Sequence, residues 1–181
     1  MQKIRYKGAT LIMVVSVILI ILGALNLLGG VSAAFLGRIT ASTLGLDEFG
    51  QSYYQVMGFV SLISGVVGLA GGIFGVRFNN HGDKAGLLLV VGIIQLIVVF
   101  FVTLYGTLTA AAGERVTQQI MDNVGVSLES DGINTLMSMG GNVMTVVTFL
   151  LPALFIVGAL LNKKPPKIPQ GYSLPEERPV E

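Results

Sequence analysis

The chain has 181 residues, of which 52% are hydrophobic and only 12% charged, and its formal net charge is +1. A soluble domain has roughly 25% charged residues, so the composition excludes an ordinary soluble protein. It also excludes nucleic-acid binding, because no basic excess is present to neutralise phosphates. Cysteine is absent and His81 is the only histidine, which excludes disulfides, thiolate metal sites and cysteine nucleophiles. We therefore expect no metal and no cofactor.

Four segments of the chain lack any charged side chain, and each is long enough to cross a bilayer. They comprise residues 8–37, 49–76, 85–113 and 132–162. About 20 apolar residues in a helix cross a hydrocarbon core of roughly 30 Å. We predict an all-α integral membrane protein, a four-transmembrane-helix antiparallel bundle with helices at about 9–30, 54–76, 85–107 and 141–161. The first is expected to be an uncleaved helix, since its apolar run exceeds the roughly 7–15 residues of a signal peptide.

The basic residues predict the orientation of these helices, because cytoplasmic flanks are enriched in Lys and Arg. Only two basic residues, Arg38 and Arg115, lie on one side of the predicted membrane. Nine lie on the other side, which holds both termini: Lys3, Arg5, Lys7, Arg77, Lys84, Lys163, Lys164, Lys167 and Arg178. We expect both termini in the cytoplasm of a plasma membrane. The absence of cysteine, and of any N-x-[ST] glycosylation sequon in the outer segments, favours a bacterial membrane.

The segments outside the predicted helices differ in character. The transmembrane domain is expected to span residues 1–162, with outer segments at 31–53 and 108–140. In the second outer segment, apolar residues recur every four positions, which indicates a helix and predicts a helical extracytoplasmic cap: Val116, Ile120, Val124 and Leu128. The region 163–181 holds five of the six prolines, so we expect a disordered Pro-rich cytoplasmic tail.

A stripe of small residues follows one face of the second predicted helix: Ser61, Gly65, Gly68, Gly72 and Gly75. Membrane helices associate by close packing rather than by hydrophobic burial, so small residues mark places where another backbone approaches. One interpretation is that the stripe holds the four helices together within one chain. The other is that it forms a groove for a helix of a partner chain, in a homo-oligomer or hetero-oligomer.

A set of polar residues, together with a proline, lies inside the charge-free segments: Asn26, Gln95, Thr103, Thr145, Thr148 and Pro152. With alternating helix directions, most of them fall in the outer half of the bundle. They predict either hydrogen bonds between helices or a polar pocket that opens outward and ends at Gln95. Proline within a helix removes one backbone hydrogen bond, which the Thr148 hydroxyl is placed to offset.

The outer segments also present acidic residues: Asp47, Glu48, Asp122, Glu129 and Asp131. In contrast, no Asp, Glu, Lys, Arg or His lies in any of the four crossings. Proton relays and ion-coupled carriers need such groups, and no paired carboxylates or catalytic motif accompany His81, so we expect neither proton coupling nor an enzyme.

Four crossings with both ends inside resemble the topology of tetraspanins, claudins and MARVEL-type proteins. The resemblance covers topology alone, because the cysteine motifs of tetraspanins and the tryptophan and cysteines of claudins are missing. Three hypotheses follow. The first is a non-enzymatic subunit or accessory protein of a membrane complex, and the second is a small oligomeric channel or facilitator with a pocket near Gln95. The third is a membrane immunity or regulatory protein that uses the acidic outer surface.

Overall fold

A computed structural model describes residues 6–125 and 131–163 of the chain. In these ranges the backbone is helical and contains no strand. The elements in chain order are α1 (Ala9–Phe35), α2 (Gly37–Thr43), α3 (Glu48–Phe78), the 3-10 turn η1 (Gly82–Lys84), α4 (Ala85–Leu108), α5 (Ala110–Val124) and α6 (Asp131–Asn162). The Pro-rich region predicted at 163–181 lies outside the described residues except for Lys163.

Four of these segments are long and apolar enough to cross a membrane: Ala9–Phe35, Glu48–Phe78, Gly82–Leu108 and Thr145–Asn162. The prediction of an all-α protein with four helices long and apolar enough to span a membrane is therefore confirmed. Two of the helices were predicted too short, because α1 continues beyond residue 30 and α6 starts before residue 141. The second helix begins at Glu48 rather than near 54, since the Asp47 carboxylate caps it and accepts a hydrogen bond of 2.7 Å from the Gly50 amide.

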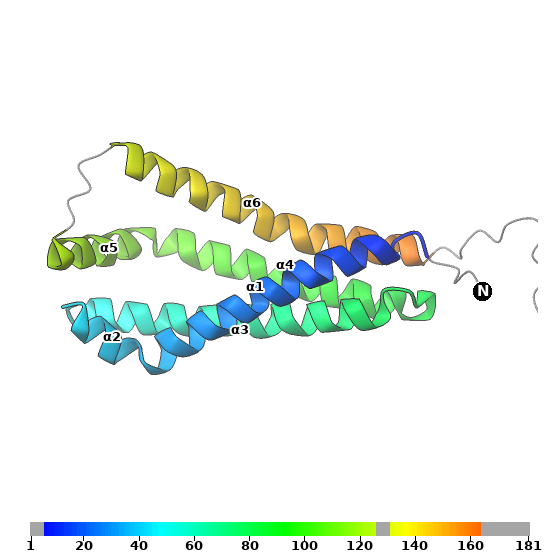
Figure 1. Cartoon of the computed structure of the whole chain (residues 1–181), viewed down its shortest axis with the longest axis horizontal. Helices are drawn as coiled ribbons and strands as arrows, with labels where there is room; N and C mark the ends of the chain where they lie inside the picture. Colours follow the sequence, from blue (N-terminus) through cyan, green and yellow to red (C-terminus); the bar gives the residue numbers. More distant parts are fainter. Residues whose placement is uncertain (1–5, 126–130, 164–181) are drawn as a thin grey trace, which may run out of the picture.

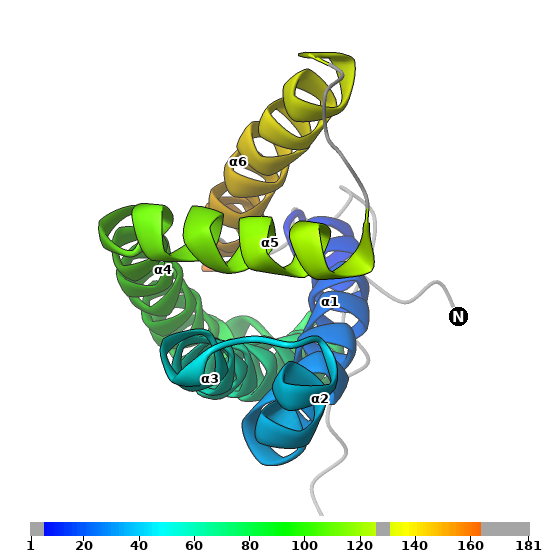
Figure 2. The same cartoon turned by 90° about the vertical axis from the view of Figure 1, so that its left-hand side faces the viewer.

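Successive long helices run in opposite directions along one axis (Figure 1). Around the bundle the order is α1, α3, α4 and α6, and α6 also contacts α1. At one end of the molecule lies the turn at residues 79–84, which we call the turn end. At the opposite end lie α2 and α5, and we call it the cap end. Towards the cap end α6 leans away from α1 and α3, as the end-on view of Figure 2 also shows.

The closest packing in the bundle joins α1 to α3, and glycines permit it. A Cβ atom on Gly23 would lie 2.6 Å from the Leu69 amide nitrogen, and one on Gly65 would lie 2.6 Å from the Leu27 amide nitrogen. No side chain fits in those positions without moving a backbone. The two helices thus touch along their main chains, as small residues allow in membrane bundles.

The turn end is filled by an apolar cluster, which we call the plug. It consists of Ile12, Val15, Leu19, Leu88, Leu151, Phe155 and Ala159. Ile12, Leu88 and Phe155 are fully buried. Beside the plug, the Asn162 side chain donates a hydrogen bond of 2.5 Å to the Asn79 carbonyl. These contacts close the bundle at the turn end and tie α6 to the turn between α3 and α4.

A second, smaller apolar cluster lies at the cap end. Ala41 of α2, Leu46 of the α2–α3 turn and Val116 of α5 are buried together, with Ile120 packed against them. Val116 and Ile120, two of the apolar residues that recur every four positions in this region, thus face this core. Here α5 is a helix separate from α4, and it ends at Gly125, whose φ of +72° favours glycine. We call α2, α5 and the start of α3 the cap.

Candidate functional site

The glycine stripe predicted as a groove is covered by α1 of the same chain along most of its length. A Cβ on Gly68 would lie 3.3 Å from the Gly23 Cα atom, and a Cβ on Gly72 would lie 2.7 Å from the Ser16 carbonyl oxygen. A Cβ on Gly75 would lie 2.6 Å from the Phe155 ring. The four glycines of the stripe, Gly65 included, therefore pack closely against α1 and α6 of the same chain.

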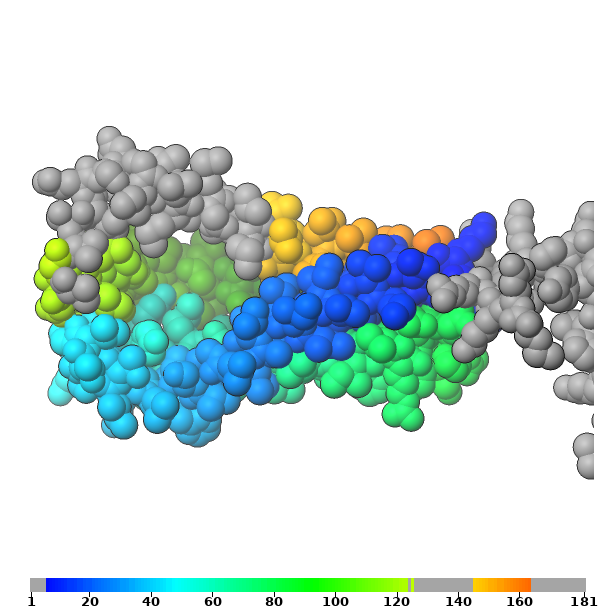
Figure 3. Space-filling model, viewed as in Figure 1, coloured from blue at the N-terminus to red at the C-terminus, as the bar shows by residue number. Residues whose placement is uncertain are grey.

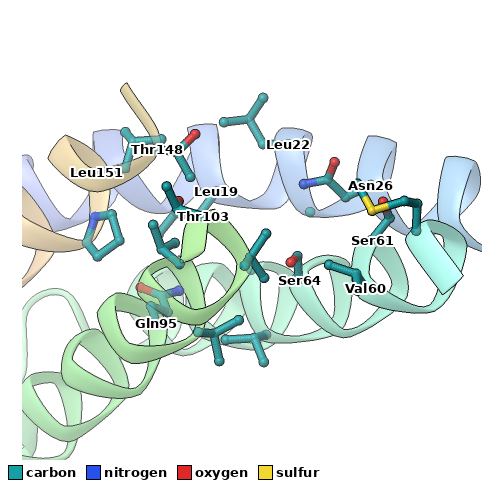
Figure 4. Close-up of a pocket in the computed structure, with 18 residues that line it drawn as sticks. Leu19, Leu22, Asn26, Val60, Ser61, Ser64, Gln95, Thr103, Thr148 and Leu151 are labelled. Atoms are coloured by element: carbon teal, nitrogen blue, oxygen red, sulfur yellow. The ribbon is translucent and has the colours of Figure 1, made fainter. Parts of the chain in front are cut away.

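Between the four long helices, on the cap-end side of the plug, lies a cavity of about 300 Å³. Figure 4 shows side chains from all four helices around it, with Asn26 on α1, Ser61 and Ser64 on α3, and Thr148 on α6. The space-filling view of Figure 3 shows the surface hollowed towards the cap end, where α4 is set back behind α1. The divergence of α6 from the other helices leaves room for this space.

The structure brings most of the predicted polar set to this one cavity. Five of its members line the cavity, namely Asn26, Gln95, Thr103, Thr148 and Pro152, and so does Ser61 from the small-residue stripe. Asn26 is exposed, whereas Pro152 is fully buried. Thr145 is the exception, because it is exposed and is not among the lining residues.

Gln95 has the most unusual surroundings of the set. Its side chain is only 2% exposed, and neither its amide nitrogen nor its amide oxygen has a hydrogen-bond partner among the residues that the structure describes. The amide rests on the backbone of α3 at Gly71, where a Cβ atom would lie 2.6 Å from Gln95 Cδ. Buried polar groups are nearly always hydrogen-bonded, so an unpartnered amide in a cavity wall calls for a functional explanation.

Most of the remaining lining is apolar, and sequence reasoning did not identify it. On α4, Val98, Val99 and Val102 line the cavity with Gln95. They lie three, four and seven positions after it, which is the spacing of one helix face. Gly71 was also missed, because its role depends on the side chain that faces it from another helix.

The cavity is closed at the turn end. Leu19 and Leu151 belong both to its lining and to the plug, so the apolar cluster forms its floor. Beyond them Ser16 is fully buried between α1 and α3. The described chain thus forms a blind cavity rather than a continuous pore.

The predicted acidic surface divides into structural and exposed residues. Asp47 caps α3, and its carboxylate lies 2.7 Å from the Arg115 guanidinium of α5. The Gly50 amide, the Gln119 side chain and Arg115 together lower the pKa of Asp47. Arg115 also lies over the Phe49 ring, 4.9 Å from its centre. Asp47 therefore joins α3 to α5 within the cap.

The other predicted acidic residues form no such contacts in the described chain. Glu48 and Asp122 are exposed. Glu129 and the side chain of Asp131 lie outside the part that the structure describes.

Comparison of the chain with protein-family models, with curated proteins and with solved structures returns no match. The function must therefore be inferred from the geometry of the chain itself.

Proposed function

We propose that this chain is a non-enzymatic multi-pass protein of a bacterial plasma membrane, with both termini in the cytoplasm and the cap outside. The distribution of basic residues supports this orientation. Arg77 and Lys84 flank the turn end, and Lys7 and Lys163 adjoin it, whereas the cap holds Arg38 and Arg115 together with several acids. In this orientation the cavity lies in the outer half of the membrane.

The function that we propose is to receive a small molecule in this outer cavity, as a facilitator or binding protein. The observation behind the proposal is that Asn26, Ser61, Gln95, Thr103 and Thr148, from four different helices, meet at one space. Concave sites with mostly apolar walls and a few convergent polar groups are the usual form of ligand sites. The plug closes the inner end, so passage of a solute through the membrane would require it to open.

The absence of cysteine from the chain allows a clean test. In Ser64→Cys the thiol lines the cavity, whereas in Ser16→Cys it lies in the closely packed α1–α3 contact. Both changes replace a hydroxyl by a thiol of similar size, so they form a matched pair. We expect a membrane-impermeant thiol reagent, applied from outside, to label Ser64→Cys and not Ser16→Cys. Equal protection of both thiols would contradict the proposal, and so would labelling of Ser64→Cys from the inside alone.

A second candidate function is that of a subunit or accessory protein which contacts another membrane chain through the cap. The supporting observation is the set of specific contacts that fix the cap. Asn123 of α5 donates hydrogen bonds of 2.9 and 3.1 Å to the Leu44 and Gly45 carbonyls, in addition to the Asp47–Arg115 ion pair. A surface held in this way is preorganised for contact with a partner.

Purification in mild detergent distinguishes the two functions. If the cap binds another chain, that chain co-purifies with the parent protein and with Gln95→Leu, but is lost from Arg115→Ala. Recovery of a monomer alone from the parent membrane would contradict the second function and leave the first unaffected.

A further inference from the structure

We propose that the ligand of the cavity is an uncharged amphiphile of about ten non-hydrogen atoms whose hydroxyl or amide group binds the Gln95 side chain. This inference rests on the proposed binding function and specifies the chemistry of what is bound. The size follows from the volume, because a water-sized group takes about 30 Å³ and the cavity measures about 300 Å³. A whole phospholipid is much larger than this.

The ligand must be uncharged because the cavity has no charged side chain among its described lining residues. A carboxylate or an ammonium group placed there would lose its hydration without gaining an ion-pair partner. The ion pair of the cap, Asp47 with Arg115, joins the start of α3 to α5 and does not line the cavity.

The walls predict that most of the ligand is apolar. Twelve of the eighteen lining residues are aliphatic residues, methionine, glycine or proline. The six polar ones are Asn26, Ser61, Ser64, Gln95, Thr103 and Thr148. Gln95 is the eleventh residue of α4 and Leu19 the eleventh of α1, and both helices start at the turn end, so Gln95 lies at the level of the cavity floor. A ligand that reaches Gln95 therefore places its hydrogen-bonding group deepest and its apolar body against Val98, Val99 and Val102.

Gln95 supplies both kinds of hydrogen-bonding atom at one point. Its amide nitrogen donates and its amide oxygen accepts, and neither has a partner among the described residues. Each atom has less than 1 Å² of exposed surface, so the ligand reaches them only when neighbouring side chains move. A hydroxyl or an amide of the ligand offers the complementary donor and acceptor. Gly71 holds the Gln95 amide in place, because the bare backbone there leaves just enough room for it. Gln95 is accordingly the anchoring residue of the site and Gly71 a positioning residue.

The test uses the full-length protein in liposomes and a photoreactive probe, 1-octanol carrying a diazirine. We expect illumination to label cavity residues on α3 and α4, as mapped by mass spectrometry, and unlabelled 1-octanol to compete. Octane, which lacks the hydroxyl, should compete at least tenfold less well. Gln95→Leu should reduce cavity labelling about tenfold, the effect of losing one or two hydrogen bonds. Gln118→Leu, the same change on the exposed face of α5, should leave labelling unchanged.

A second variant distinguishes loss of ligand binding from a folding defect in Gln95→Leu. In Gly71→Ala the new methyl group would lie 2.6 Å from Gln95 Cδ and displace the amide, so cavity labelling should fall while Gln95 itself remains. Equal competition by octane and 1-octanol would overturn the inference, as would cavity labelling that neither variant changes. Labelling confined to lipid-facing side chains would overturn it too.

The two proposals fail separately. If Ser64→Cys is labelled from outside but Gln95→Leu does not change labelling by the octanol probe, the proposed ligand class is wrong and the proposal of an outer cavity is retained. If octanol binding depends on Gln95 but Ser64→Cys resists the external reagent, the ligand class stands and the outward opening is wrong.

Discussion

Replacement of Gln95 by leucine should make the protein more stable, although it removes a polar residue from a helix. The side chain is 2% exposed, and its two amide atoms have no hydrogen-bond partner in the described part of the chain. Leucine is close to glutamine in size and in helix propensity, so it fills the same space on α4 without leaving a cavity. The change therefore removes an unsatisfied polar group and little else.

The expected gain follows from the cost of leaving a buried polar group without a partner, about 1–3 kcal/mol. For a chain of this length, each 1 kcal/mol changes the melting temperature by about 2–4 °C. We thus expect Gln95→Leu to raise the melting temperature by about 2–12 °C. Circular dichroism in detergent, with the ligand-free protein, measures this directly.

The same substitution at Gln55 provides a matched control. The Gln55 side chain on α3 donates a hydrogen bond of 3.2 Å to the Ala34 carbonyl of α1. Its loss should lower the free energy of unfolding by about 1 kcal/mol, so Gln55→Leu and Gln95→Leu should have opposite signs. If Gln95→Leu melts at a lower temperature than the parent, then its amide makes stabilising bonds in the fold. The functional explanation of its burial would then be refuted.

Three further predictions concern the packing of the helices and the cap. A Cβ on Gly30 would lie 2.6 Å from the Leu62 amide nitrogen, whereas a Cβ on the adjacent Gly29 meets nothing within 4 Å. Gly30→Ala should therefore lower the free energy of unfolding by about 1–3 kcal/mol, whereas Gly29→Ala should raise it by about 0.5–1 kcal/mol. Thermal unfolding measures both, and equal effects would contradict the α1–α3 contact. Arg115→Ala should increase proteolysis within α5 and leave the transmembrane helices resistant, because Arg115 joins α5 to α3 through Asp47; unchanged cleavage would show that this pair does not hold the cap. The Gly50 amide, Gln119 and Arg115 lower the pKa of Asp47 from its ordinary value of 3.8. The ionised carboxylate therefore stabilises the cap fully at pH values above 3.8, and this stability is lost as the pH falls through the lower pKa of the folded state. Proteolysis of α5 should accelerate over that acidic range, and Asp47→Asn should remove this dependence; an identical pH profile in both proteins would contradict it.

The membrane class could be predicted from the sequence because it depends on properties of single segments. Charge-free length predicts the spans regardless of how the helices pack. Exact helix ends could not be predicted, since glycines such as Gly50 weaken a helix assignment. Their effect is offset by a cap that only the structure reveals, the Asp47 carboxylate on the Gly50 amide.

The candidate site could be predicted in part, for a related reason. Helix direction and depth placed Asn26 and Thr103 in the outer half of the bundle and Gln95 at the inner end of the predicted pocket, and the structure brings them to one cavity. The spacing of small residues predicts that the backbone of another helix packs against that face, but it does not predict which helix or which chain. The packing of α1 against the α3 stripe could therefore not be deduced from the sequence. The pairing of Gly71 with Gln95 depends on the rotation of two helices about their own axes, which no pattern in either helix specifies.

The most direct test of an outer ligand site anchored by Gln95 is the rate at which an external thiol reagent labels Ser64→Cys, with and without saturating 1-octanol. Because Ser64 and Gln95 line the same cavity, bound octanol should slow labelling several-fold. The protection should vanish when Gln95→Leu is added to Ser64→Cys. Labelling that proceeds at the same rate with and without octanol, or protection that persists without Gln95, would contradict the account.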